Sequence, residues 1–149
     1  DAAHGILALS LGTLVTAGVV LFVAAEPLVG LFTRDGTTIG YAVAFTRVFA
    51  VSTVSFGVFF PLAGALRGAG DTRTPFYARL LGSALFLLGA SYLLGVTLGY
   101  GLPGVHAGIA LSYVCWAAVV VVGFRRGGWA ETATAMIAER SERDEPTRR

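Results

Sequence analysis

The sequence has little charge. Only 13% of its 149 residues are charged, whereas 55% are hydrophobic, and the mean hydropathy is +0.73. A water-soluble domain carries roughly a quarter charged residues. It needs them because a domain of about 150 residues still exposes much of its surface to solvent. This composition excludes an ordinary soluble globular domain and predicts a chain whose solvent is lipid.

Cysteine, histidine and lysine are also scarce. The chain has one cysteine, Cys115, and two histidines, His4 and His106, which are expected at opposite membrane faces. One cysteine excludes an internal disulfide, and these residues assemble neither a metal site nor a nucleophile–base pair. There is no lysine, and the net charge of +2 is too small for a nucleic-acid-binding surface. We therefore predict no enzyme, no cofactor and no nucleic-acid partner.

Long apolar runs make up most of the chain. A helix needs about 20 apolar residues to cross a bilayer, and four segments reach that length. Turn-forming runs of Gly, Asp, Arg and Pro separate them. We predict an all-α, polytopic transmembrane bundle in residues 1–128, with spans at about 5–32, 39–66, 75–98 and 104–124, followed by a polar cytoplasmic tail over 129–149.

The arginines predict the orientation of these spans. Five of them lie at one side of the predicted membrane, around the link between spans two and three and at the end of span four: Arg67, Arg73, Arg79, Arg125 and Arg126. On the other side Arg34 is offset by Asp35. Positively charged loops stay in the cytoplasm. We therefore predict a multi-pass protein of the cell membrane with both ends of this chain in the cytoplasm.

Small residues recur every four positions in three of the spans: Ala8, Gly12 and Thr16; Ser91, Gly95 and Gly99; Gly104, Gly108 and Ser112. This spacing lets helix backbones approach closely in lipid, where no hydrophobic force drives helices together. It fits packing among the spans of this chain. Alternatively, it fits a seam between copies of a small membrane protein.

The second span carries the candidates for lining a substrate cavity. Small and hydroxyl residues share one face of this helix, and an arginine lies beside them: Thr46, Thr53, Gly57 and Arg47. Such a face either packs against another helix or lines a watery cavity. Arg47 either snorkels to the lipid headgroups or faces the bundle, where Glu26 is a candidate partner. Pro61 removes the hydrogen bond to the Gly57 carbonyl and therefore predicts a kink.

The link between the second and third spans has its own turn chemistry. Its glycines permit positive φ and a tight turn, and Thr74 before Pro75 predicts the start of a helix. Asp71 can cap that helix or pair with Arg67 or Arg73. We assign a structural and gating role to this motif loop, with the residues Arg67, Gly68, Gly70, Asp71, Thr72, Arg73 and Pro75.

The motif loop lies in a longer run, residues 64–75 (GALRGAGDTRTP), which closely resembles the signature of the multidrug and toxic compound extrusion (MATE) family. Residues 27–35 (PLVGLFTRD) and 101–105 (GLPGV) resemble links before and after it in that family. Together the resemblance covers residues 5 to about 128, although only the part from Arg67 to Pro75 is specific.

The resemblance implies a twelve-helix transporter of two six-helix lobes, which exchanges Na⁺ or H⁺ for small organic, often cationic, compounds. This chain would supply helices nine to twelve, and its partners would be the lipid bilayer and the missing N-terminal lobe. The site for the coupling ion would lie outside the chain, because residues 39–66 contain no acid. A chain that opens with Asp1 and has no basic leader is accordingly expected to be a fragment.

Two other functions stay open. A lipid-linked oligosaccharide flippase would share the fold, but such proteins usually lack this motif. A flippase would also need a large cationic cavity, and one arginine within a span, Arg47, argues against that. A small membrane protein that transports nothing would instead oligomerise through its small-residue faces.

Overall fold

The computed structural model describes residues 2–128, together with residues 133–135, 137 and 138. Its elements are α1 (Ala2–Val23), α2 (Ala25–Gly30), α3 (Gly36–Gly68), α4 (Arg73–Leu81), the π-helical segments η1 (Gly82–Ala90) and η2 (Leu93–Thr97), and α5 (Leu102–Arg126). Most of the predicted polar tail, 129–149, lies outside the described residues.

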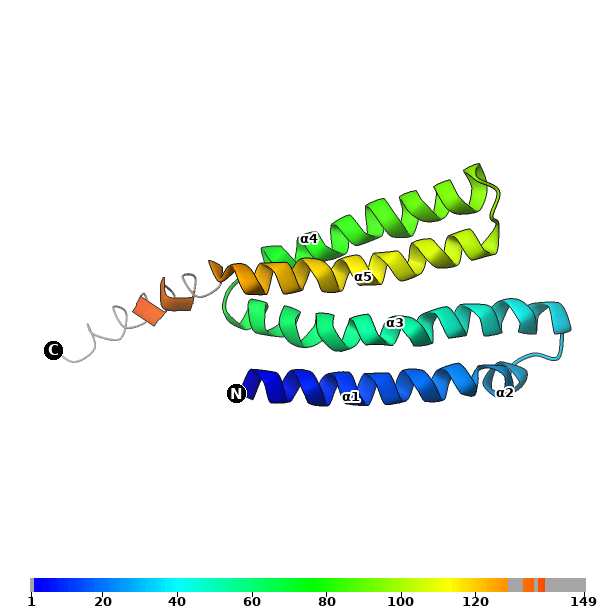
Figure 1. Ribbon diagram of the computed structural model, residues 1–149, viewed down its shortest axis with the longest axis horizontal. Helices are drawn as coiled ribbons and strands as arrows, with labels where there is room; N and C mark the ends of the chain where they lie inside the picture. Colours follow the sequence, from blue (N-terminus) through cyan, green and yellow to red (C-terminus); the bar gives the residue numbers. More distant parts are fainter. Residues whose placement is uncertain (1, 129–132, 136, 139–149) are drawn as a thin grey trace.

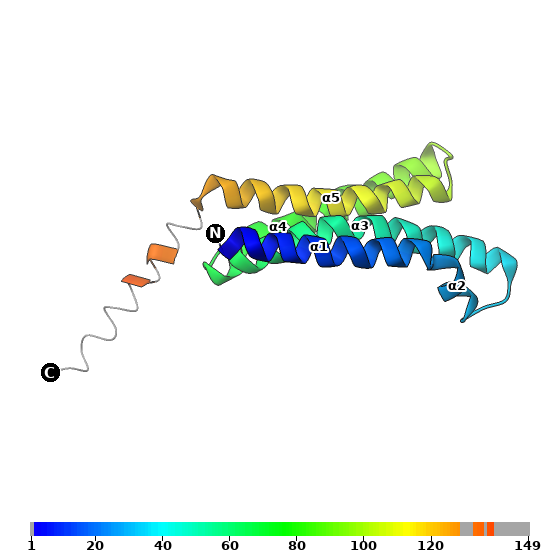
Figure 2. The same ribbon diagram turned by 60° about the horizontal axis from the view of Figure 1, so that its bottom comes forward.

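Four helical stretches are long and apolar enough to cross a membrane: Gly5–Val23, Gly36–Gly68, Arg73–Thr97 and Leu102–Arg126. They lie side by side in the order α1, α3, α5 and the third span, which runs from α4 to η2 (Figures 1 and 2). In the most apolar part of α1 only 6% of the residues are buried, so the bundle leaves its apolar surface to lipid. The predicted all-α bundle of four spans is confirmed.

The first predicted span, 5–32, contains two helices. α1 ends at Val23, and α2 then turns away from the bundle axis (Figure 2). The cause is Pro27, which has no N–H to donate to the Val23 carbonyl and whose ring would clash with that carbonyl. The helical hydrogen bonds resume at Leu28, whose N–H donates to the Ala24 carbonyl at 3.0 Å.

The small-residue stripes of the third and fourth spans face each other. A methyl group added at Gly104 would lie 2.6 Å from the Leu94 carbonyl carbon, and one at Gly108 would lie 2.6 Å from the Ser91 amide nitrogen. The Ser91 hydroxyl also donates to the Val105 carbonyl across this contact, at 3.2 Å. These two stripes therefore pack within the chain. The stripe on α1 differs, because Gly12 has nothing within 4 Å of the same position.

The third span changes its winding after α4. In η1 and η2 the amides donate five residues back, as from Ser91 to Phe86 and from Leu98 to Leu93 (2.8 Å). Apolar runs do not distinguish this wider helix from an α-helix, so the sequence did not predict it. Where the span ends, Gly101 has φ 61° and ψ −139°, a conformation that only glycine adopts readily.

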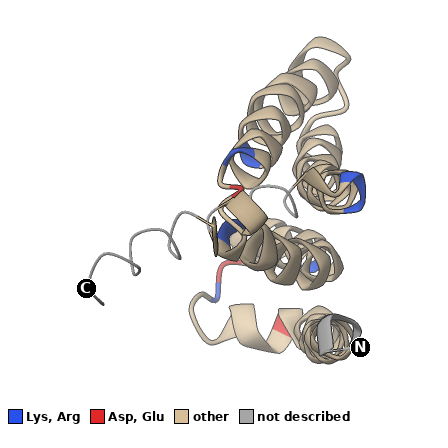
Figure 3. Ribbon diagram, turned by 90° about the vertical axis from the view of Figure 1, so that its left-hand side faces the viewer, with Lys and Arg blue, Asp and Glu red and all other residues tan. Residues whose placement is uncertain are grey.

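The buried core lies at the end of the bundle that carries the motif loop. It consists of side chains from α3, α4 and α5: Phe59, Leu62, Ala63, Leu66, Ala78 and Val120. Trp116 packs against this core and against the bare backbone of Gly82. The motif loop is thus attached to the buried core. Charged residues occupy few positions along the described ribbon (Figure 3), and many large hydrophobic side chains elsewhere in the bundle are exposed.

Candidate functional site

The motif loop begins where α3 stops. Gly70 has φ 88°, in the left-handed region. The N–H of Gly70 donates to the Arg67 carbonyl at 3.0 Å, and the N–H of Asp71 donates to the Leu66 carbonyl at 2.8 Å. This pair of bonds is the Schellman arrangement, which satisfies carbonyls that a helix end leaves without partners. Gly70 is therefore the residue that ends α3.

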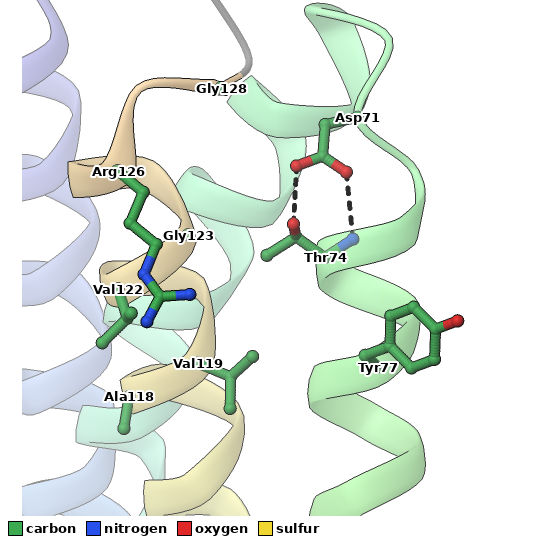
Figure 4. Close-up of a pocket in the computed structure, with 9 residues that line it drawn as sticks. All are labelled: Asp71, Thr74, Tyr77, Ala118, Val119, Val122, Gly123, Arg126 and Gly128. Atoms are coloured by element: carbon green, nitrogen blue, oxygen red, sulfur yellow. Dashed lines mark hydrogen bonds between the residues drawn. The ribbon is translucent and has the colours of Figure 1, made fainter.

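The side chain of Asp71 then starts the next helix (Figure 4). One carboxylate oxygen accepts from the Thr74 amide at 3.0 Å, and the other accepts from the Thr74 hydroxyl at 2.6 Å. The predicted helix start at Thr74 was wrong, because α4 already begins at Arg73. The alternative prediction that Asp71 caps this helix is confirmed. Pro75 fits in the first turn, where an N–H would have no helical partner.

The charge on Asp71 follows from these bonds. Burial alone would raise the pKa of the carboxyl, but hydrogen bonds from the Thr74 hydroxyl and amide and from the Arg73 amide, with the Arg73 charge, outweigh it. The pKa of Asp71 is therefore held below its ordinary value, and the group is ionised at neutral pH. The partners of Asp71 are therefore Thr74 and Arg73. The predicted alternative, a pair with the Arg67 side chain, is not among them.

A lowered pKa gives this cap a pH dependence. The folded-state pKa lies below the unfolded value of about 3.9, so ionised Asp71 stabilises the fold above about pH 4. That contribution is lost as the pH falls through the folded pKa. We expect the difference in melting temperature between wild type and Asp71→Asn to stay constant from about pH 8 to about pH 5 and to shrink below about pH 4. In a Thr74→Val background, which lacks the hydroxyl donor to Asp71, this decrease in the melting-temperature difference should be smaller. A difference independent of pH down to about pH 2 would contradict the assigned ionisation.

The same cap recurs at the start of α3, on the opposite side of the bundle. Asp35 accepts from the Thr38 amide at 2.8 Å and from the Thr38 hydroxyl at 2.6 Å. These bonds lower the pKa of Asp35 as well. The shared signal is an aspartate followed three residues later by a threonine, in DGTT and DTRT. This spacing marks the start of both helices, and at Asp35 it is the signal from which a cap could have been predicted.

The structure separates the four cavity candidates of α3 into two pairs. Thr53 and Gly57 pack on α1: the Thr53 hydroxyl lies 3.0 Å from the Leu14 carbonyl oxygen, and a methyl group at Gly57 would lie 3.2 Å from the Leu11 Cα. Thr46 and Arg47 line open grooves, both of which His106 of α5 also lines. The role of these residues toward a substrate stays a prediction.

Arg47 is exposed and stacks on an aromatic ring. Its guanidinium carbon lies 5.4 Å from the centre of the Phe22 ring on α1. Glu26 is exposed on α2, and no ion pair joins it to Arg47 within the described part of the chain. α3 runs through Pro61 without interruption, and the predicted kink stays a prediction.

Two arginines whose positions in the sequence indicated only the orientation of the spans have further roles in the structure. Arg79 lies over the rings of Phe59 and Trp116, with its guanidinium carbon 5.7 and 5.2 Å from their centres. Arg126 lines an open groove of about 470 Å³ between α4 and α5, the α4–α5 groove, with Asp71, Thr74, Tyr77, Ala118, Val119, Val122, Gly123 and Gly128 (Figure 4). Asp71 and Arg126 are far apart in the sequence, so spacing could not reveal this groove.

Gly70 provides a direct test of the loop geometry. Because its φ is 88°, Gly70→Ala should destabilise the folded protein by about 1–2 kcal/mol. The matched control is Gly68→Ala, at the end of α3, where a methyl group meets nothing within 4 Å. That change should be neutral or stabilise by up to about 1 kcal/mol. Thermal unfolding in detergent measures both effects, and equal effects would contradict the assigned turn.

Comparison with known proteins places these features in one family. The sequence profile of the MatE family matches residues 2–100. The match covers α1 to η2, including the motif loop, while α5 lies beyond its end. Neither the curated proteins nor the solved structures contain a match to this chain.

Proposed function

Because the chain belongs to the MatE family of membrane transporters, which are not enzymes, we propose that it works in the efflux of small organic, often cationic, compounds in exchange for Na⁺ or H⁺. The observation that carries this proposal is the profile match over residues 2–100. The motif loop supports it, since the segment that most resembles the MATE signature is the one where Asp71 joins two membrane helices.

The four spans correspond, on this proposal, to helices nine to twelve of a twelve-helix transporter. α1 supports such an arrangement because one of its faces has no partner within the described residues. This face forms an open groove along Ala8, Leu9, Gly12, Thr13, Thr16 and Ala17. Small residues at such spacing suit close contact with a further helix, which the remaining helices of the transporter would supply.

The coupling ion would bind outside this chain. α3 contains no aspartate or glutamate between Gly36 and Gly68, so the second span offers no carboxylate to a cation. Transport therefore needs the other lobe. A reading frame upstream of Asp1 that encodes eight further spans, each of about 20 apolar residues, would support this proposal.

Transport by the complete polypeptide tests the function. Membrane vesicles that contain it should expel a fluorescent organic cation when an inward H⁺ or Na⁺ gradient is imposed, and collapse of the gradient should stop the efflux. Movement of a lipid-linked oligosaccharide without any drug efflux would favour a flippase. Stable oligomers of a chain of only 149 residues, with neither activity, would favour a structural membrane protein.

The orientation has its own test, in a Cys115→Ala background. Cysteines at Gly36 and Leu102, which are exposed at one end of the bundle, should react with an impermeant thiol reagent in intact cells. Cysteines at Thr72 and Ala135, also exposed, should react only after permeabilisation. These results follow if the arginine-rich motif loop faces the cytoplasm. The reverse labelling pattern would overturn the orientation and leave the transport proposal standing.

A further inference from the structure

The α4–α5 groove is polar at one end and apolar along its length. Asp71 and Arg126 lie where α4 begins and α5 ends, so both are at a membrane surface whichever side of the membrane that is. From Arg126 the lining continues along α5 through Val122 and Val119 to Ala118. That stretch extends about 12 Å toward the bilayer interior. An occupant of this groove must therefore be amphiphilic.

Opposite charges lie on the two sides of the polar end of the groove, which we call its mouth. Arg126 is exposed on α5, and Figure 4 shows its side chain extending back along the helix beside Val122. Asp71 lies across the groove on the α4 side, and Thr74 holds its carboxylate. Within residues 2–128 no ion pair joins Asp71 to Arg126. The mouth thus offers a separated cation and anion to a ligand that carries both charges.

The width of the mouth is set by a close helix contact. A methyl group at Gly123 would collide with the Thr74 methyl group, so the Thr74 side chain packs directly on the bare backbone of α5 there. The contact holds the Asp71 cap beside the last turns of α5. Because Thr74 is held by Asp71 on one side and packs on Gly123 on the other, the groove is formed before a ligand arrives, which lowers the cost of binding.

We propose that the α4–α5 groove binds a phospholipid whose headgroup carries an ammonium with N–H donors, of the phosphatidylethanolamine type. Arg126 binds the phosphate, since guanidinium donors match phosphate oxygens. Asp71 accepts from the ammonium, and an acyl chain lies along Val122, Val119 and Ala118. A choline headgroup has no N–H to donate to Asp71. An anionic lipid without an ammonium would leave its negative charge beside that carboxylate.

Lipid binding to the complete polypeptide tests this inference. The purified protein is placed in phosphatidylcholine nanodiscs with small, equal fractions of phosphatidylethanolamine or phosphatidylglycerol of the same acyl chains, and the retained lipid is measured by native mass spectrometry. Wild type should prefer phosphatidylethanolamine over both other lipids by roughly tenfold, because one charge-assisted hydrogen bond is at stake. Asp71→Asn should remove this preference, because the neutral amide no longer offers a charged acceptor to the ammonium.

The matched control is the pair of neighbouring arginines at the end of α5. Arg126→Gln should weaken the binding of all three lipids about fivefold, whereas Arg125→Gln, at an exposed residue that does not line the groove, should have no effect. Val122→Trp fills the groove without changing a charge and should also displace the lipid. It covers the case in which a charge variant fails to fold.

Three results would overturn the inference: equal affinity of wild type for all three lipids, equal effects of Arg125→Gln and Arg126→Gln, or strong new lipid binding once residues 129–149 are removed. The last would identify the tail as the occupant of the groove. The measurement uses neither a drug nor an ion gradient. Its failure is therefore distinct from failure of the proposed transport function.

Discussion

Gly108→Ala is expected to destabilise the protein by about 1–3 kcal/mol, the usual range for overpacking a tight contact. The added methyl group would lie 2.6 Å from the Ser91 amide nitrogen and 2.8 Å from the Ser91 Cα. Both are backbone atoms, so α5 and the third span must separate. Separation also stretches the hydrogen bond from the Ser91 hydroxyl to the Val105 carbonyl, at 3.2 Å. The melting temperature in detergent measures the loss.

The matched substitution is Gly40→Ala on α3. Gly40 is also helical, but a methyl group there meets nothing within 4 Å. Replacing an exposed helical glycine by alanine stabilises a helix by up to about 1 kcal/mol. The same chemical change should therefore have opposite signs at the two glycines. Destabilisation of equal size at both would mean that the small residues of α5 are not a packing contact.

Asp71→Asn in the complete transporter is expected to slow transport severalfold while leaving equilibrium drug affinity unchanged. The substitution keeps the size of the side chain but removes the charge that accepts from the Thr74 amide and hydroxyl. Loss of a helix cap costs about 1 kcal/mol, which shifts an equilibrium between two transporter conformations about fivefold. Thr74→Val, which removes one donor, should slow transport less. The measurement compares initial efflux rates with drug affinity for each variant.

Asp35→Asn provides the control. Asp35 makes the same two bonds, to Thr38, at the opposite end of α3. If the motif loop controls the conformational change, loss of the Asp35 cap should affect transport less than loss of the Asp71 cap. Equal slowing by both variants would reduce Asp71 to an ordinary helix cap. Unchanged transport in Asp71→Asn would make the motif loop a passive turn.

The sequence predicts the features that depend on composition and local chemistry. Apolar runs give the four spans, because lipid requires about 20 apolar residues in each helix. Glycine at position 70 predicts a turn with positive φ, and the structure has one at 88°. The stripes through Gly95 and Gly108 predict close helix packing, and those two spans do meet backbone to backbone.

Other features depend on contacts that the sequence does not encode in its spacing. For the start of α4 the sequence left two residues open, Thr74 and Asp71, and only the structure shows that the carboxylate of Asp71 is the acceptor. The partner of Gly57 is Leu11, on a different helix. The π-helical winding and the position of Arg126 across a groove from Asp71 depend on the tertiary arrangement, so no local pattern predicts them.

The link between α3 and α4 is fixed at both ends by hydrogen bonds of a single residue. The Asp71 amide is bonded to the last turn of α3, while the Asp71 carboxylate is bonded to the first turn of α4. One residue thus connects both helices, and a rotation of α3 about its axis must apply torque directly to α4. The link on the other side differs, since residues 33–35 are non-helical. Rigid-body motion of the second and third spans would therefore pivot about this end, with the larger displacement at the far end.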